Sequence, residues 1–476
     1  MADILSVGID IGTSTTQLVF SRLTMENLAG YFSVPRISIV KKEVVYKSRV
    51  YLTPLKTPVL IDGEAVRDIV AAEFTAAGYI PADVDTGAVI ITGESARKEN
   101  AAEVLEKLSG FAGEFVVSTA GPDLESIIAG KGSGACQYSI ENACTTANLD
   151  IGGGTTNIVL FDNGDVVSKG CLDIGGRLIR LKPDFTVESV SPAAARIAEQ
   201  VGVTLRCGER TSLEELSRIT DKMADLLAQA MGRKPQEPLL RTIQTPESSW
   251  LEPDGKQIAR ICFSGGVADC IADGISEPIP YGDIGVLLGR SIAQGQLYRE
   301  FQQLEGEETI RATVVGAGTY TTSISGSTIL CAQELLPIKN LPALKLTAKE
   351  QAQCFAGEEG LLAEKVRWFL AQSGAERMIL AMEGKADPNY GELKCLAHCL
   401  AVELDRALPE GAPVLIVMEH DTAKALGILL RSALKGRRKV VCIDGIKVEQ
   451  GDYVDLGRPV LGGLVIPVVV KTLLFG

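Results

Sequence analysis

The feature that most constrains the fold of this chain is a pattern that occurs twice. In each copy an aspartate ends an apolar run, a glycine-containing turn follows, and two threonines lead into a second apolar run. The first copy reads Asp10-Ile-Gly-Thr-Ser-Thr-Thr, and the second reads Asp150-Ile-Gly-Gly-Gly-Thr-Thr. Each copy predicts a β-hairpin with a polar tip. Two equivalent hairpins in one chain indicate a duplicated α/β unit.

The chemistry of the two turns favours phosphate binding. Glycine lets the backbone approach an anion and turn its N–H groups toward it, and threonine hydroxyls add donors. The carboxylates of Asp10 and Asp150 are candidate catalytic and metal-site residues, because Mg²⁺ prefers oxygen ligands and usually keeps part of its water. Two such hairpins facing each other would hold a polyphosphate from both sides. The predicted phosphate-binding residues are Gly12, Thr13, Ser14, Thr15, Thr16, Gly152, Gly153, Gly154, Thr155 and Thr156.

A third glycine turn is a candidate for the adenosine site. Gly265 and Gly266 follow an apolar strand and precede a helix, so an adenosine could lie against their backbone. Gly316-Ala-Gly318, after a second apolar run that we predict to be a strand, is the alternative. None of these turns has the Gly-x4-Gly-Lys-Ser/Thr pattern of a P-loop. The acid precedes the glycines on the same strand, which also excludes a Rossmann fingerprint.

The composition of the chain bears on which kinds of partner it can have and on the cellular compartment in which it works. The net charge is −13, and no strongly basic stretch is long enough to predict nucleic acid as the main partner. The apolar C-terminal stretch, 460–475, is interrupted by Pro467 and Lys471 and is shorter than the ~20 residues of a membrane span, so we expect no membrane partner. The eleven cysteines lack framework spacing, and Cys395 and Cys399 are expected to be buried thiols on a helix. We therefore expect a cytoplasmic protein with reduced thiols.

The order of these motifs resembles the superfamily of actin, sugar kinases and heat-shock chaperones. The first phosphate loop, a connecting helix near 121–135, the second phosphate loop, an adenosine loop at 263–269 and a second connecting helix at 283–293 follow one another as they do there. The resemblance implies an α/β actin-like ATPase of duplicated, ribonuclease H-like halves, with ATP and Mg²⁺ as cofactors. We predict the first half at 1–141, the second at 142–300, and an additional α/β region at 301–476.

A closer resemblance extends along the whole chain. The opening strand-and-turn segment, the run Ile91-Thr-Gly-Glu-Ser-Ala-Arg and the ending Ile466-Pro-Val-Val-Val-Lys-Thr-Leu are similar to the reactivating factors of ethanolamine ammonia-lyase. This resemblance implies a chaperone-like ATPase with that adenosylcobalamin-dependent lyase as its protein partner. Such a factor promotes release of damaged cobalamin and its exchange for intact coenzyme. It also implies a cytoplasmic location in association with the ethanolamine microcompartment.

The residue that activates the attacking water is less sharply indicated by the sequence. Glu94, at the end of a predicted strand, is our candidate, and Asp173 is the alternative. Both are also compatible with a capping or surface role. Two rival functions share this fold: a small-molecule kinase, which needs a general base at a substrate pocket, and an actin-type filament or scaffold protein. Only two histidines, His398 and His420, are present, which argues against histidine-centred catalysis.

Overall fold

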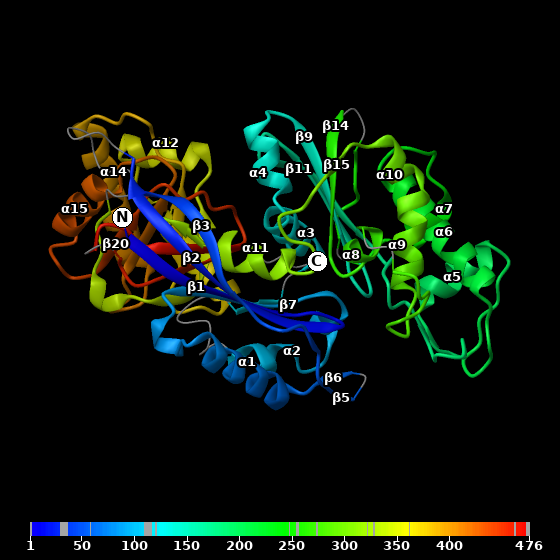
Figure 1. Ribbon diagram of the computed structural model, residues 1–476. Coiled ribbons are helices and arrows are strands. Elements are labelled where there is room, and N and C mark those ends of the chain that lie inside the picture. Colours follow the sequence, from blue (N-terminus) through cyan, green and yellow to red (C-terminus); the bar gives the residue numbers. More distant parts are fainter. Residues whose placement is uncertain are drawn as a thin grey trace.

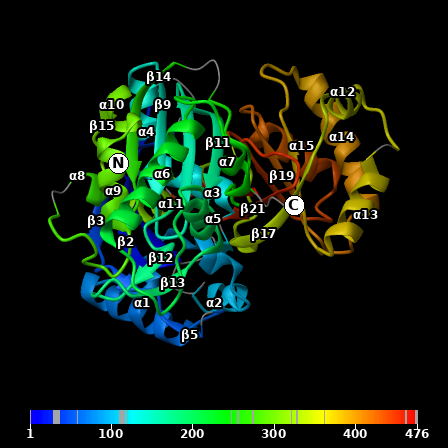
Figure 2. The same cartoon turned by 90° about the vertical axis from the view of Figure 1, so that its right-hand side faces the viewer.

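The structure is a computed structural model of the 476-residue chain (Figure 1). Two α/β halves lie side by side, and a third α/β region, drawn in yellow, orange and red, packs beside the first half (Figures 1 and 2). The structure describes residues 2–28, 37–57, 59–108, 117–119, 121–246, 248–253, 257–272, 275–320, 322–326, 329–360, 362–460 and 463–472.

The first half is built on a sheet with strand order β3-β2-β1-β7-β8, and β4 pairs with β2. The predicted first hairpin is confirmed and extends further along the chain than the pattern indicated. Helices α1 and α2 belong to this half, and α1 covers one face of the sheet in the core that contains Val7, Ile9 and Phe20. The elements are β1 (Ala2–Ile11), β2 (Thr15–Asn27), β3 (Ile37–Lys47), β4 (Tyr51–Leu52), β5 (Leu55–Thr57), β6 (Leu60–Ile61), α1 (Gly63–Ala77), β7 (Thr86–Ile91), α2 (Ala101–Leu108) and β8 (Val117–Thr119).

The second half repeats this sheet. Its strand order is β11-β10-β9-β14-β15. In both halves three antiparallel strands are followed by parallel ones, since β7 runs parallel to β1 and β14 runs parallel to β9. The predicted duplication and the actin-like fold are therefore confirmed. The strands are β9 (Thr145–Ile151), β10 (Thr156–Asp162), β11 (Asp165–Leu172), β14 (Ile258–Ser264) and β15 (Gln303–Leu304).

The two predicted phosphate hairpins have the same register. Asp10 lies opposite Gln17 across the first hairpin, and Asp150 lies opposite Asn157 across the second. The turn is closed in each by a backbone hydrogen bond, from Gly12 to Thr15 at 2.8 Å and from Gly152 to Thr155 at 2.9 Å. The repeated sequence thus forms the same local structure twice, because both hairpins use the same turn with the same pairing.

A helical subdomain extends the second half and buries a large apolar core against β9 and β10. Helix α6 begins at a capping box in which Ser212 and Glu215 satisfy each other's backbone N–H groups, as expected for a Ser-x-x-Glu start. Its elements are β12 (Ile179–Leu181), β13 (Val187–Val190), α5 (Pro192–Gln200), α6 (Leu213–Ala230), α7 (Pro238–Thr242), α8 (Ala268–Ala272), α9 (Gly285–Gln294) and α10 (Gln296–Glu300).

The helices that connect the halves are α3 (Pro122–Gly132) and α11 (Ala312–Tyr320), which cross each other at the centre of the molecule (Figure 1). The first agrees with the predicted connecting helix; the short α4 (Ala135–Glu141) follows it. The second connecting helix, predicted at 283–293, is wrong. That segment forms α9, which packs on α6 and α8 inside the second half.

The strand predicted from Thr313 to Val315 is also wrong, because this segment is part of α11. A short apolar run with β-branched residues does not distinguish a strand from a buried helix. The segment forms a helix because it packs closely against α3. A Cβ on Gly316 would lie 2.1 Å from the backbone oxygen of Ile128, and one on Gly132 would lie 1.9 Å from that of Ala312. The glycines are therefore contact points between two helices and form no turn.

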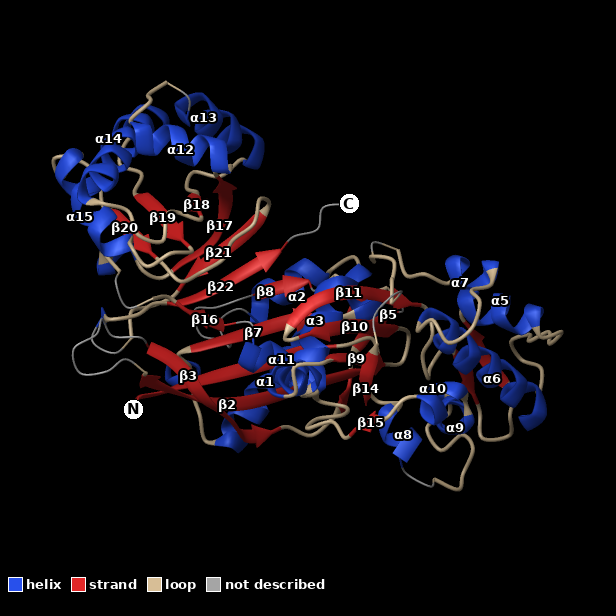
Figure 3. Ribbon diagram, turned by 90° about the horizontal axis from the view of Figure 1, so that it is seen from above, coloured by secondary structure: helices blue, strands red, loops and turns tan. Residues whose placement is uncertain are grey.

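The C-terminal region has its own sheet, with strand order β16-β22-β21-β17-β18-β19-β20 (Figure 3). Strands β17 to β20 are parallel, and the helices α12 to α15 bury one face of this sheet. The elements are β16 (Thr322–Ile324), β17 (Ile338–Lys345), α12 (Ala348–Ala356), α13 (Leu362–Ser373), β18 (Ile379–Met382), α14 (Tyr390–Ala407), β19 (Val414–Met418), α15 (Ala423–Ala433), β20 (Val440–Ile443), β21 (Asp452–Leu456) and β22 (Pro467–Thr472).

The boundary of this region, predicted at 300/301, stays a prediction. Strand β15 pairs with β14, and α11 packs on α3, so the chain stays within the duplicated core until the end of α11. We propose a boundary near residue 321. The described helices include none that is long and apolar enough to cross a membrane. Cys395 and Cys399 lie on α14, as expected, but only the thiol of Cys399 is buried, whereas Cys395 is exposed.

Candidate nucleotide-binding cleft

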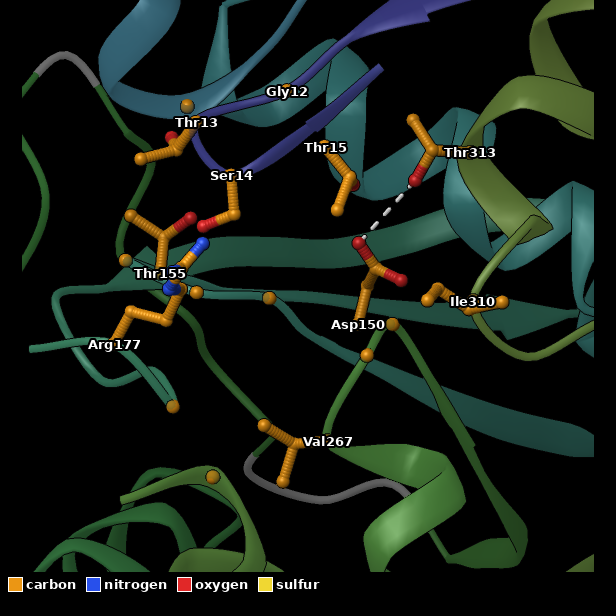
Figure 4. A pocket seen from close by; sticks show the side chains of 18 of the residues that line it. Gly12, Thr13, Ser14, Thr15, Asp150, Thr155, Arg177, Val267, Ile310 and Thr313 are labelled. Atoms are coloured by element: carbon orange, nitrogen blue, oxygen red, sulfur yellow. Dashed lines mark hydrogen bonds between the residues drawn. The ribbon is translucent and has the colours of Figure 1, made fainter. Parts of the chain in front are cut away.

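A cavity of about 600 Å³ lies between the two halves, where the tips of both hairpins meet (Figure 4). Its wall is formed by the two loops, the starts of α3, α8, α9 and α11, and the end of β7. The lining residues are Asp10, Gly12, Thr13, Ser14, Thr15, Gln17, Leu52, Thr92, Gly93, Glu125, Asp150, Gly152, Gly153, Gly154, Thr155, Gly176, Arg177, Gly265, Gly266, Val267, Asp269, Cys270, Ile275, Tyr281, Asp283, Gly285, Ile310 and Thr313.

The two predicted phosphate loops face each other at close range. A Cβ built on Gly153 would lie 2.4 Å from Oγ of Ser14, so the glycine allows the two loops to meet. Figure 4 shows Ser14 from the first loop directed toward Thr155 from the second. The structure brings together all the predicted loop residues except the second threonine of each pair.

Those two threonines, Thr16 and Thr156, do not line the cleft. Thr16 shares a hydrogen bond with Oγ1 of Thr53 at 3.1 Å, and Thr156 donates to the backbone oxygen of Ile174 at 2.8 Å. Both are fully buried. The reason is the alternation of a β-strand: since Thr15 and Thr155 face the cleft, the next residue in each strand faces the opposite side.

The carboxylates of Asp10 and Asp150 are buried at the floor of the cleft. Asp10 accepts a hydrogen bond from Thr92 at 2.9 Å. Asp150 accepts one from Ser264 at 2.6 Å and a longer one from Thr313 at 3.4 Å, which Figure 4 marks as a dashed line. Burial raises the pKa of Asp10 to about 7 and that of Asp150 to about 6. The hydroxyl partners act in the opposite direction, but they only partly offset the loss of water.

A third carboxylate, Glu125 in the first turn of α3, completes this group. It accepts a hydrogen bond from the backbone N–H of Gly93 at 3.2 Å. Burial, followed by the charges of Asp150 and Asp10, raises its pKa to about 8. We did not predict Glu125 from the sequence. The available signal was an acid in the first turn of the predicted connecting helix, where it looks like an ordinary dipole partner.

The side chain of Glu94, our predicted water-activating residue, lies outside the described residues, so its role stays a prediction. The alternative, Asp173, does not line the cleft and accepts a hydrogen bond from Thr245 at 2.7 Å. Gln17 is a second residue that the sequence analysis missed. Its amide lines the cleft, and its Oε1 is buried with no hydrogen-bond partner. The sequence signal for Gln17 was its equivalence to Asn157, because each of these amides lies opposite the aspartate of its hairpin.

The predicted adenosine turn also lies in the wall. Gly265 has φ of 85°, and its N–H donates to the backbone oxygen of Thr309 at 3.0 Å. The Cα of Gly266 faces open space, because the nearest atom to a Cβ there is 4.0 Å away on Ile310. The alternative pair, Gly316 and Gly318, lies within α11 and does not line the cleft.

The donor set suits a hydrated cation. Among the described residues no ion pair neutralises Asp10, Glu125 or Asp150. No three His, Cys, Asp or Glu side chains in the described part of the chain are grouped tightly enough to hold a metal ion directly. Mg²⁺ prefers oxygen ligands and keeps several of its waters, so the carboxylates at the floor of the cleft could hold it through those waters. The unpartnered Oε1 of Gln17 is a further acceptor for such a water.

A solved structure of the Aquifex aeolicus Ppx/GppA phosphatase is 15% identical to this chain, and the similarity covers 66% of this chain and 99% of that structure, with a TM-score of 0.39. Proteins named ethanolamine ammonia-lyase reactivase EutA are 36% identical, from Salmonella typhimurium over 472 residues and from Escherichia coli over 473.

Both alignments cover 99% of this chain and 98% of the relative. Neither relative therefore has a large segment that this chain lacks. The family model described as ethanolamine utilisation protein EutA matches residues 2–476. The match includes the two halves, the cleft between them and the C-terminal region. The chain belongs to the EutA family.

Proposed function

We propose that this protein is an ATP-dependent reactivating factor for ethanolamine ammonia-lyase, which promotes the exchange of damaged cobalamin for intact coenzyme. One observation carries the ATP-dependent part: two glycine-rich loops from duplicated halves meet in one cleft around three buried carboxylates. Membership of a family whose relatives are named reactivases supports the lyase as the partner. The location, in the cytoplasm and in association with the microcompartment, stays a proposal.

Nucleotide binding divides among the described residues as follows. The N–H groups and hydroxyls of both loops hold the phosphates, and the open face of Gly266 receives the adenosine. Asp10 and Asp150 hold a hydrated Mg²⁺, with Gln17 as an additional acceptor. When bound, the ion offsets the charge of the phosphates.

Glu125 is our proposed general base for hydrolysis. A carboxyl whose pKa is about 8 in the nucleotide-free cleft is poised near neutral pH, where a base accepts a proton from water most effectively. The N–H of Gly93 fixes its orientation. We therefore expect Glu125→Gln to slow ATP hydrolysis by roughly 100-fold or more, and to leave nucleotide binding nearly unchanged.

The nucleotide state can be transmitted to the partner through the connecting helix α11. Thr313, at one end of α11, contacts Asp150 in the cleft, and the other end leads into β16 of the C-terminal sheet. Hydrolysis removes phosphate contacts that both halves share. A change of about 1–3 kcal/mol between the two states would alter the affinity for the lyase by roughly 5–150-fold.

The test uses ethanolamine ammonia-lyase inactivated by bound cyanocobalamin. We expect recovery of activity only when this protein, ATP, Mg²⁺ and fresh adenosylcobalamin are all present. Asp10→Asn should abolish recovery, whereas Asp173→Asn, the same change in another Asp-Ile-Gly segment outside the cleft, should retain it. Full recovery without nucleotide, or none with the complete mixture, would refute the reactivation function.

A further inference from the structure

The cleft contains a strong imbalance of charge. Five of its lining residues are acidic: Asp10, Glu125, Asp150, Asp269 and Asp283. Among the described lining residues only Arg177 is cationic. A nucleoside triphosphate adds several negative charges to this environment, and one divalent cation neutralises only part of them. Arg177 can offset the remaining negative charge only if its guanidinium lies close to the phosphate loops.

The backbone of Arg177 is attached to the second phosphate loop. Its N–H donates to the backbone oxygen of Gly153 at 2.7 Å, and the N–H of Gly176 donates to that of Gly152 at 3.0 Å. The Cγ and Cδ atoms of Arg177 each lie 3.4 Å from the position of a Cβ on Gly153, the same point that Oγ of Ser14 approaches. Figure 4 shows the side chain reaching toward Thr155 and Ser14, where the two loops meet.

The guanidinium has one weak partner in the nucleotide-free structure. Its Nε lies 3.5 Å from Oδ2 of Asp283, which is an ion pair without a hydrogen bond. The other oxygen of Asp283 accepts a hydrogen bond from Gly285 at the start of α9, at 2.9 Å. The described contacts give the two terminal nitrogens of Arg177 no hydrogen bond. A guanidinium has five N–H donors in a planar fork that matches a phosphate, so most of its capacity is available.

We propose that Arg177 binds the terminal phosphate of the nucleoside triphosphate, and that Asp283 holds the guanidinium when that phosphate is absent. The inference rests on the proposed nucleotide function and adds to it a residue that distinguishes the triphosphate from the diphosphate. Because Asp283 stands at the start of α9, the exchange of partners links the phosphate loops to the helix beside the purine side of the cleft.

The experiment measures the dissociation constants of Mg-ADP and of a non-hydrolysable imido analogue of ATP by calorimetry on the full chain. We expect Arg177→Gln to weaken the analogue roughly 10- to 100-fold, the range for hydrogen bonds to a charged group, and ADP by less than about threefold. Arg177→Lys should fall between, since an ammonium keeps the charge but loses the fork. Asp283→Asn removes the competing carboxylate, so affinity for the analogue should hold or rise.

Arg206→Gln is the matched control. This exposed arginine pairs with Glu209 and does not line the cleft, so both affinities should stay at the wild-type values. Equal weakening of ADP and the analogue by Arg177→Gln would assign the residue a structural role, and no change in either would also overturn the proposal. If the wild-type protein binds neither nucleotide, the proposed function itself fails, a result separate from any effect of the substitutions.

Discussion

Neighbouring residues of the phosphate hairpins have different roles, because successive side chains of a β-strand point to opposite faces. Thr155 and Thr156 are neighbours of identical chemistry. The first lines the cleft, and the second is fully buried and bonded to the backbone of Ile174. A side chain in the cleft affects ligand binding, whereas one on the opposite face of the strand affects the stability of the fold.

We therefore expect opposite results from the same substitution at these two positions. Thr155→Val should weaken Mg-ATP binding roughly fivefold, the equivalent of one hydrogen bond of about 1 kcal/mol, with little change in stability. Thr156→Val should lower the free energy of unfolding by about 1–2 kcal/mol and leave affinity for ATP intact. Calorimetric titration and urea unfolding of both variants measure the two effects. A loss of affinity at Thr156 that matches the loss at Thr155 would contradict the assigned orientations.

The buried carboxylates lead to a second prediction, which concerns how the stability of the protein depends on pH. In the folded protein without nucleotide, the pKa values of Asp150, Asp10 and Glu125 are raised to about 6, 7 and 8. The unfolded chain loses these protons near pH 4, while the folded chain keeps them. The free energy of unfolding therefore falls as the pH rises from about 4 to about 8.

Glu125→Gln removes the group whose ionisation costs most at the upper end of this range. Without nucleotide or Mg²⁺, the variant should unfold at a higher temperature than the wild type, and the gap should be larger at pH 8 than at pH 5. Thermal unfolding at both pH values measures it. An equal difference in unfolding temperature at both pH values would show that ionisation of Glu125 does not destabilise the folded protein.

At the scale of elements, the crossing of α3 and α11 holds the two halves together. Each helix presents a glycine to the backbone of the other, with no space for a side chain at Gly132 or Gly316. Ser6 on β1 also donates to the backbone oxygen of Gly318, so α11 is fixed to the first sheet as well. Any atom added at the crossing must separate the helices.

Gly316→Ala is expected to destabilise the protein by about 2–3 kcal/mol and to reduce ATP hydrolysis, because Thr313 on the same helix moves with it. Gly121→Ser is the matched control. It lies at the start of α3 in open space, and serine is favoured as an N-cap. Urea unfolding and ATPase assays compare the two variants. Wild-type stability in Gly316→Ala would show that the helices cross less closely than described here.

At the scale of the whole molecule, the C-terminal sheet contacts the duplicated core at a small apolar cluster. Val469 of β22 packs with Ala88, Ile90, Ile128 and Ala317, which come from β7, α3 and α11. The elements that surround the candidate nucleotide cleft therefore touch the C-terminal sheet. This contact is our proposed route from nucleotide state to lyase binding.

Val469→Thr places a hydroxyl in this apolar contact, at a cost of about 1–3 kcal/mol. We expect ATP hydrolysis within about twofold of the wild type and a loss of lyase reactivation. Val454→Thr makes the same change at a buried position inside the C-terminal sheet, away from the core contact, and should reactivate the lyase normally. Equal reactivation by both variants would exclude the contact at Val469 as the route.

The sequence alone determined what is local in this protein. The duplicated hairpins, their glycine turns and the strand before Gly265 follow from short-range patterns and φ requirements, and the structure agrees with them. Tertiary structure decided what depends on contact between distant segments. Glu125 approaches Asp10 and Asp150 only because α3 crosses the cleft, and Gly316 lies in a helix because α3 is there to pack against it. Such contacts join residues far apart in the chain, and the periodicity of apolar residues along the sequence cannot predict them.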